Sequence, residues 1–99
     1  MRDVMTYRRS AAVEETLVGD RVVLYHRSSG AAIVLNPTAS ILWSELLSER
    51  DLSQLQKTLM DRFPRIDRSR IQHNVESCLV ELANHHLISA RRDTSQTVE

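Results

Sequence analysis

The chain has 99 residues, with 13 basic and 13 acidic side chains and a formal net charge of zero at pH 7. This length provides for one domain with one modest core, and the ordinary hydrophobic share of 41% excludes a disordered chain. A net charge of zero disfavours a nucleic-acid binder, because neutralising phosphates drives most of the affinity of such proteins. No apolar run resembles a signal peptide or a membrane helix, so we expect a soluble, cytoplasmic protein.

The first third of the chain is typical of β-strands. Val13–Val18 and Arg21–His26 flank Gly19-Asp20, a pair that suits a tight hairpin turn. A second turn at Ser28-Ser29-Gly30 leads into the apolar segment Ala31–Leu35. Three strands joined by two short turns predict an antiparallel meander.

At Asn36-Pro37 the pattern changes from strand to helix, because Asn is a favoured N-cap and Pro a favoured first helical residue. We expect a second helix from about Asp51 to Pro64, and a third from Asp67, which can cap it, to His85-His86. The apolar stripes of the three helices are Ala39, Leu42, Trp43, Leu46 and Leu47; Leu52, Leu55, Leu59, Met60 and Phe63; and Ile71, Val75, Cys78, Leu79 and Leu82. Strands followed by helices predict an α+β domain, a three-stranded antiparallel meander and then three helices.

The segment Ala31–Leu35 is expected to form an edge of the sheet. It is short, uncharged and mostly apolar, and it lacks the Lys or Pro that commonly protects an edge strand. Either the core covers both of its faces, or another strand pairs with its free side. The residues alone leave both interpretations open.

The junction between strand and helix resembles one known family. The residues that carry the resemblance are Gly30, the strand that ends at Leu35, Asn36-Pro37-Thr38-Ala39, Ile41-Leu42-Trp43 and Leu46-Leu47. In this order they are similar to the PqqD-like family, over roughly residues 12–88, with flexible segments expected at 1–11 and 89–99. Ala32 and Ile33 stand where members often carry aromatic residues. Asn84 is expected to replace the family's Gly as the left-handed cap of the last helix.

The resemblance implies a winged-helix-like, non-catalytic domain that captures the leader of a ribosomally made precursor peptide. In such domains the leader adds as an antiparallel strand to the third strand and lies against the third helix. The domain presents the precursor to a modifying enzyme or a leader peptidase, and this chain is most similar to the lasso-type or general versions. A peptide chaperone of pyrroloquinoline quinone (PQQ) biosynthesis is an alternative. The peptide-binding residues implied are Ala31, Ala32, Ile33, Val34, Leu35, Arg70, Asn74, Val75, Cys78, Leu79, Glu81 and Leu82.

No residue pattern predicts catalysis, a metal site or a cofactor. Cys78 lies on an apolar stripe and is interpreted as a buried thiol. Trp43 is interpreted as a core residue rather than a stacking platform for bases. The histidines lack metal-ligand spacing: His26, His73, His85 and His86.

The strongest alternative function is a winged-helix DNA-binding regulator. Four arginines cluster where a recognition helix would meet bases: Arg62, Arg65, Arg68 and Arg70. The interspersed Asp61 and Asp67, together with the zero net charge, disfavour this interpretation. A third interpretation is a subunit that forms a homodimer through the same sheet edge.

Overall fold

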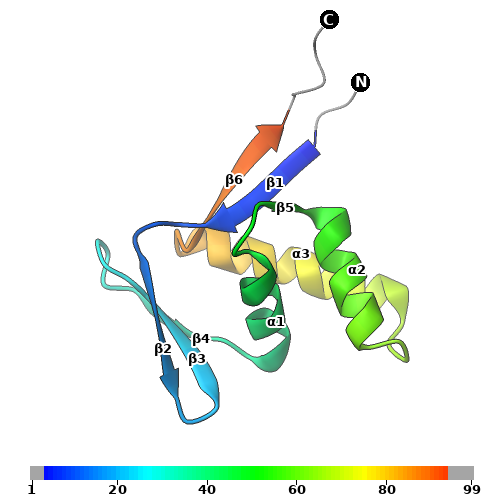
Figure 1. Cartoon of the computed structure of the whole chain (residues 1–99), viewed down its shortest axis with the longest axis horizontal. Helices are drawn as coiled ribbons and strands as arrows, with labels where there is room; N and C mark the ends of the chain where they lie inside the picture. Colours follow the sequence, from blue (N-terminus) through cyan, green and yellow to red (C-terminus); the bar gives the residue numbers. More distant parts are fainter. Residues whose placement is uncertain (1–3, 94–99) are drawn as a thin grey trace, which may run out of the picture.

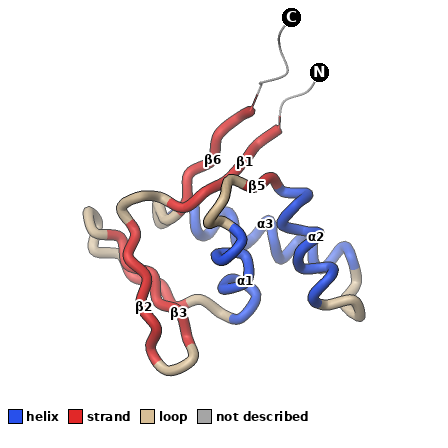
Figure 2. Tube along the Cα trace, viewed as in Figure 1, coloured by secondary structure: helices blue, strands red, loops and turns tan. Residues whose placement is uncertain are grey.

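A computed structural model describes residues 4–93 of the chain. Its elements, in chain order, are β1 (Val4–Arg9), β2 (Val13–Val18), β3 (Arg21–His26), β4 (Ala32–Val34), α1 (Pro37–Glu45), β5 (Arg50–Asp51), α2 (Leu52–Arg62), α3 (Arg68–Asn84) and β6 (Ile88–Asp93). One antiparallel sheet has the order β2-β3-β4 and the other has the order β5-β1-β6. The first sheet lies beside α1, while β1 and β6 run across the other side of the helices (Figure 1, Figure 2). The predicted α+β class, with a meander followed by three helices in a winged-helix-like arrangement, is confirmed.

The meander forms where local turn signals predict it. The hairpin of β2 and β3 pairs Val18 with Arg21 around Gly19, whose φ of 65° is the left-handed conformation that glycine adopts without strain. A second left-handed glycine, Gly30 with a φ of 76°, precedes β4. Both predicted turns are therefore confirmed, although β4 is shorter than the predicted segment.

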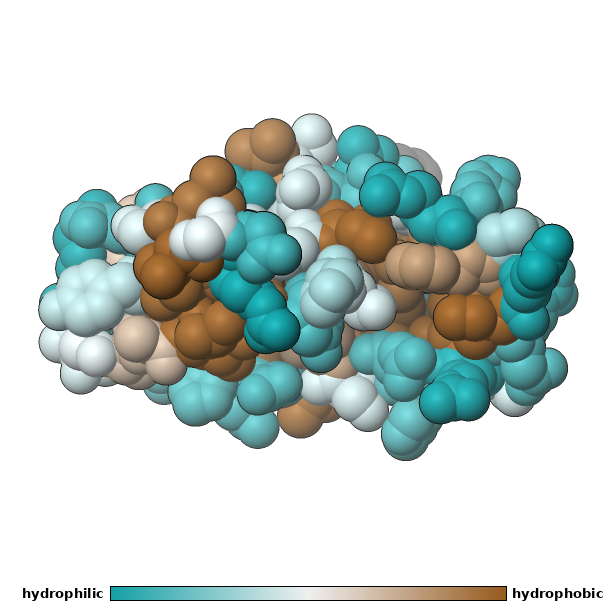
Figure 3. Space-filling view, turned by 90° about the horizontal axis from the view of Figure 1, so that it is seen from below, coloured by the Kyte–Doolittle hydropathy of each residue, from teal (hydrophilic) through white to brown (hydrophobic). Residues whose placement is uncertain are grey.

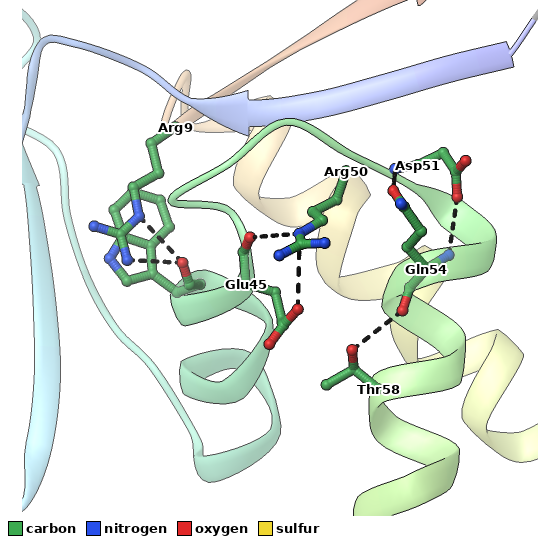
Figure 4. Close-up of polar contacts among 7 residues, drawn as sticks. Arg9, Glu45, Arg50, Asp51, Gln54 and Thr58 are labelled. Atoms are coloured by element: carbon green, nitrogen blue, oxygen red, sulfur yellow. Dashed lines mark hydrogen bonds and ion pairs between the residues drawn. The ribbon is translucent and has the colours of Figure 1, made fainter.

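Asn36 caps α1 as the sequence predicts, and Asp51, where the second helix was expected to start, caps α2. The Asn36 side chain accepts a hydrogen bond from the Ala39 N–H at 2.8 Å. Asp51 and Gln54 form a reciprocal capping box, with N–H to side-chain distances of 2.9 and 2.8 Å (Figure 4). Asp67 occupies the N-cap position of α3, but its side chain makes no capping hydrogen bond.

The end of α3 differs from the prediction. The left-handed residue is His86, with a φ of 60°, rather than Asn84, which is still helical. The His86 N–H donates to the Ala83 carbonyl at 3.0 Å, and the Leu87 N–H donates to the Leu82 carbonyl at 2.9 Å. These two bonds form a Schellman motif that satisfies the last carbonyls of the helix. Leu87 and Leu82 are both buried, so the hydrophobic contact typical of this motif places the left-handed turn at His86.

The hydrophobic core lies between the inner face of the meander and the three helices. Its largest fully buried side chains are Leu24, Leu42, Leu46, Leu55, Leu59, Val75, Leu82 and Leu87. Leu47 was expected on the buried stripe of α1, but the residue is 76% exposed. The helix ends at Glu45, so Leu47 follows the turn at Leu46 and no longer shares the helical spacing.

The two end segments form paired strands where flexible segments were expected. β1 and β6 pair along their whole length, from Val4 opposite Asp93 to Arg9 opposite Ile88. The Arg9 guanidinium lies 4.3 Å from the centre of the Trp43 ring and donates to the Trp43 carbonyl at 2.8 and 3.1 Å (Figure 4). This contact attaches β1 to α1. Residues 1–3 and 94–99 of the expected flexible segments lie outside the described residues.

Candidate functional site

β4 is an edge strand, because it pairs with β3 on one side and with no other described strand. The pairing begins with the His26 N–H, which donates to the Ala31 carbonyl at 2.9 Å. It ends with the Leu35 N–H, which donates to the Val22 carbonyl at 2.8 Å. In an antiparallel ladder, hydrogen-bonded pairs alternate with pairs whose N–H and C=O groups point away from each other. The residue halfway between Ala31 and Leu35 therefore also bonds to β3.

That halfway residue is Ile33, which lies opposite Leu24. It follows that the N–H and C=O groups of Ala32 and Val34 point to the free side of β4. Ile33, the central residue of β4, therefore offers no outward hydrogen bond. An incoming strand would find the donors and acceptors of Ala32 and Val34.

The side chains of β4 divide between two faces. Leu35 is buried in the core and Ile33 packs against it. Ala32 is exposed, and Val34, on the same outer face, is 55% exposed. A strand added to β4 would therefore have one set of side chains over the helices and one set on the outer face.

A hollow of about 260 Å³ lies beside the end of β4, between the start of α1 and the middle of α3. Its floor includes the small residue Ala39 and the half-buried Cys78, and its other five lining residues are all polar. The lining residues are Asn36, Thr38, Ala39, Asn74, Ser77, Cys78 and Glu81. We call this hollow the α1–α3 groove. It is large enough for one side chain of an extended peptide.

Three of the predicted site residues on α3 line this groove: Asn74, Cys78 and Glu81. Three others belong to the core instead, because Val75, Leu79 and Leu82 are at most 5% exposed. Arg70 is exposed and lies one helical turn before Asn74 on the same side of α3. The direct contact of any of these residues with a peptide stays a prediction.

The sequence analysis missed four lining residues of the groove. Asn36, Thr38 and Ala39 were interpreted only as the start of a helix or as core, and Ser77 carried no signal. Their role follows from the packing of α1 across α3. Helical spacing could have suggested Ser77, which lies three residues after Asn74 and four before Glu81.

The groove holds no activated nucleophile. Burial, and to a smaller extent the negative charge of Glu81, raises the pKa of the Cys78 thiol to about 11. The thiol is therefore protonated at neutral pH. Within residues 4–93, no group of three or more His, Cys, Asp or Glu side chains could hold a metal ion. In the same part of the chain, no helix is long and apolar enough to cross a membrane.

The outer face of the meander exposes several large apolar side chains. Val18, Tyr25 and Val34 are each more than 40% exposed, and the strand register places all three, together with Val23, on the face that carries Ala32. Figure 3 shows hydrophobic side chains gathered over the side of the molecule that carries the meander. Exposed apolar patches of this kind commonly mark interaction surfaces.

Comparisons with known proteins place these features in context. Residues 21–88 match the family described as coenzyme PQQ synthesis protein D (PqqD). A solved structure described as TbiB1 in complex with the TbiA(beta) leader peptide is 26% identical, covers 83% of this chain and 94% of its own, and has a TM-score of 0.74. A second, lasso peptide synthetase B1 complexed with the leader peptide, is 17% identical, covers 84% and 96%, and has a TM-score of 0.71, which shows a shared fold. The search of curated proteins found no match.

Proposed function

The chain belongs to the PqqD family, and we propose that it captures the leader of a ribosomally made precursor peptide as an added strand beside β4. The observation that carries the proposal is the free edge at Ala32 and Val34, which lies next to the α1–α3 groove. The 26% identical structure, itself a complex with a leader peptide, supports the same function.

The proposed binding mode follows from the two faces of β4. Hydrogen bonds to the backbone of Ala32 and Val34 supply affinity for any extended chain. Selectivity comes from side chains that alternate between the groove and the outer face of the meander. Polar residues surround the small floor of the groove, so it favours a side chain that also makes a hydrogen bond to Asn74 or Glu81.

We further propose that the chain presents the bound leader to a second protein, a modifying enzyme or a leader peptidase, in a lasso-type or related pathway. The alternative is that the second protein is a modifying enzyme of PQQ biosynthesis. The outer face formed by Val18, Val23, Tyr25 and Val34 is the proposed contact surface, because it continues directly into the added strand. In this function the chain needs neither catalytic groups nor a cofactor, and it acts in the cytoplasm, where precursors are made.

The experiment is a titration of the ¹⁵N-labelled chain with the leader peptide encoded beside its gene. We expect the amide signals of Ala32 and Val34, and those of Asn74 to Glu81, to shift in proportion to bound peptide. The signals of Leu55 and Leu59, deep in α2, serve as an internal control and should move little. If excess peptide leaves the signals of β4 and the groove in place, the proposed function is wrong.

A further inference from the structure

The turn between α2 and α3 carries an unneutralised positive charge. Within residues 57–70 the chain has five basic and two acidic side chains, although its total charge is zero. Lys57 lies 3.4 Å from the Asp61 carboxylate, and Asp67 accepts a hydrogen bond from Ser69. In the described part of the chain, no ion pair or hydrogen bond holds the exposed guanidinium groups of Arg62, Arg65, Arg68 and Arg70. We call these four residues the arginine end.

The arginine end and the α1–α3 groove are joined by one side of α3, which carries residues of both. Arg70 precedes Asn74 by four residues, and Ser77 and Cys78 follow on the same side of the helix. At a rise of 1.5 Å per residue, Arg70 lies about 6 Å along the helix axis from Asn74 and about 12 Å from Cys78. Four residues of extended peptide span this distance.

The direction of an added strand decides which part of a precursor meets this surface. A strand antiparallel to β4 begins beside Val34 and ends beside Ala32. The residues before it therefore lie near Asn36, which follows β4 and lines the groove. From there the upstream part of the precursor can follow α3 towards its first turn.

We propose that the precursor segment upstream of the strand beside β4 is acidic and runs along α3 from the groove to Arg70. This inference rests on the proposed function and specifies its ligand. Arg70 would contact a carboxylate directly. The other arginines attract the segment over the Debye length of about 8 Å at physiological salt.

A nucleic acid fits the same surface less well. The apolar residues Phe63 and Ile66 lie among the arginines and line a second, smaller hollow with Arg68. This mixture of arginines and apolar side chains instead suits an acidic peptide that also carries apolar residues.

The test measures the dissociation constant of the full chain for three peptides. These are the leader encoded beside its gene, a version with the upstream Asp and Glu residues changed to Asn and Gln, and a version truncated before the strand. Arg70→Glu is the test variant. Arg21→Glu is the matched control, because Arg21 is also an exposed arginine, at the hairpin tip away from the groove.

We expect Arg70→Glu to weaken binding of the intact leader about three- to ten-fold at low salt, with little loss at high salt. Arg21→Glu should leave the affinity unchanged, and the neutral and truncated leaders should bind both variants alike. A leader with Lys in the upstream segment should regain affinity for Arg70→Glu.

Several results would overturn the inference. In the first case, the truncated leader binds and shifts the β4 signals, but Arg70→Glu and the control have the same dissociation constant for the intact leader. The proposed contact between an acidic segment and Arg70 is then wrong, and the proposed function stands. If no leader binds, the proposed function fails as well. If Arg70→Glu impairs only processing of the leader by the client enzyme, or only binding of a DNA duplex, the arginine end serves that partner instead.

Discussion

Leu24 of β3 and Ile33 of β4 lie opposite each other as a hydrogen-bonded pair, in which the N–H and C=O groups of each residue point to the other. This pairing turns the backbone groups of Ala32 and Val34 outward. It also directs the Ile33 side chain towards the core, where Leu24 is fully buried. One register thus determines both how β4 is stabilised and what it offers to another chain.

Replacing Val34 by Pro should weaken leader binding at least ten-fold, because Pro removes the outward N–H without removing a bond to β3. Leu17→Pro is the matched control, since the register of β2 and β3 turns the Leu17 N–H towards the other free edge of the sheet. Ile33→Pro removes a bond to β3 and should lower the free energy of unfolding. Calorimetric titration and denaturant unfolding measure the two effects. Equal leader affinities of Val34→Pro and Leu17→Pro would argue against β4 as the binding edge.

Filling the α1–α3 groove should block the leader without unfolding the chain. Ser77→Phe places a ring in the hollow, and we expect at least a ten-fold loss of leader affinity. Glu76→Phe puts the same ring on the exposed surface of α3 outside the groove and should bind normally. Both changes concern exposed residues, so the free energy of unfolding should change by about 0.5 kcal/mol or less. Normal binding by Ser77→Phe would remove the groove from the site.

Cys78 should react slowly with iodoacetamide at neutral pH, because burial raises the pKa of its thiol to about 11. The alkylation rate, measured by mass spectrometry, should rise with pH up to about pH 11. Bound leader should slow the reaction further, since Cys78 lines the groove. A rate that levels off below pH 9, or that is unchanged by saturating leader, contradicts this prediction. Cys78→Ser supplies the unreactive control.

The two leucines that follow α1 provide a test of the core. Leu46→Ala should reduce the free energy of unfolding by about 2–5 kcal/mol, because Leu46 is 1% exposed and its loss leaves a cavity. Leu47→Ala should change it by about 0.5 kcal/mol or less. Urea denaturation followed by the fluorescence of Trp43 measures both. Similar losses for the two variants would show that Leu47 is buried after all.

Tyr25→Ser should separate presentation of the leader from its capture. Tyr25 is 44% exposed on the outer face and lies opposite Ala32, so its removal leaves the β4 backbone in place. We expect an unchanged dissociation constant for the leader and a several-fold slower reaction of the client enzyme on the bound precursor. Leu47→Ser, at an exposed apolar residue outside the meander, is the control and should react normally. Loss of leader affinity in Tyr25→Ser would assign this face to the leader itself.

Local signals explain why much of the fold could be predicted from the sequence. Gly19 marks a turn, and Asn36 and Asp51 cap helices, through contacts with residues close in the chain. β1 and β6 could not be found in this way, since Arg9 and Ile88 pair across most of the chain length. β1 and β6 are stabilised by pairing with each other and by the contact of Arg9 with Trp43 of α1. These partners lie too far apart in the chain for a local sequence pattern to reveal them.

The candidate site was predicted in part for the same reason. An apolar strand before Asn36 indicated an edge of the sheet, but only the register shows that the backbone groups of Ala32 and Val34, rather than those of Ile33, point outward. On α3, the apolar pattern could not separate core from groove. Val75 and Cys78 share one stripe in the sequence, yet Val75 is fully buried and Cys78 lines the hollow.

The pairing of β1 with β6 brings the start and the end of the described chain together, on the side away from β4 (Figure 1). The domain can therefore be spliced into a longer polypeptide, or attached to a surface by either end, while its capture edge stays accessible. It also allows a circular permutant in which a short linker joins Val4 to Asp93 and new ends open at the hairpin tip near Gly19.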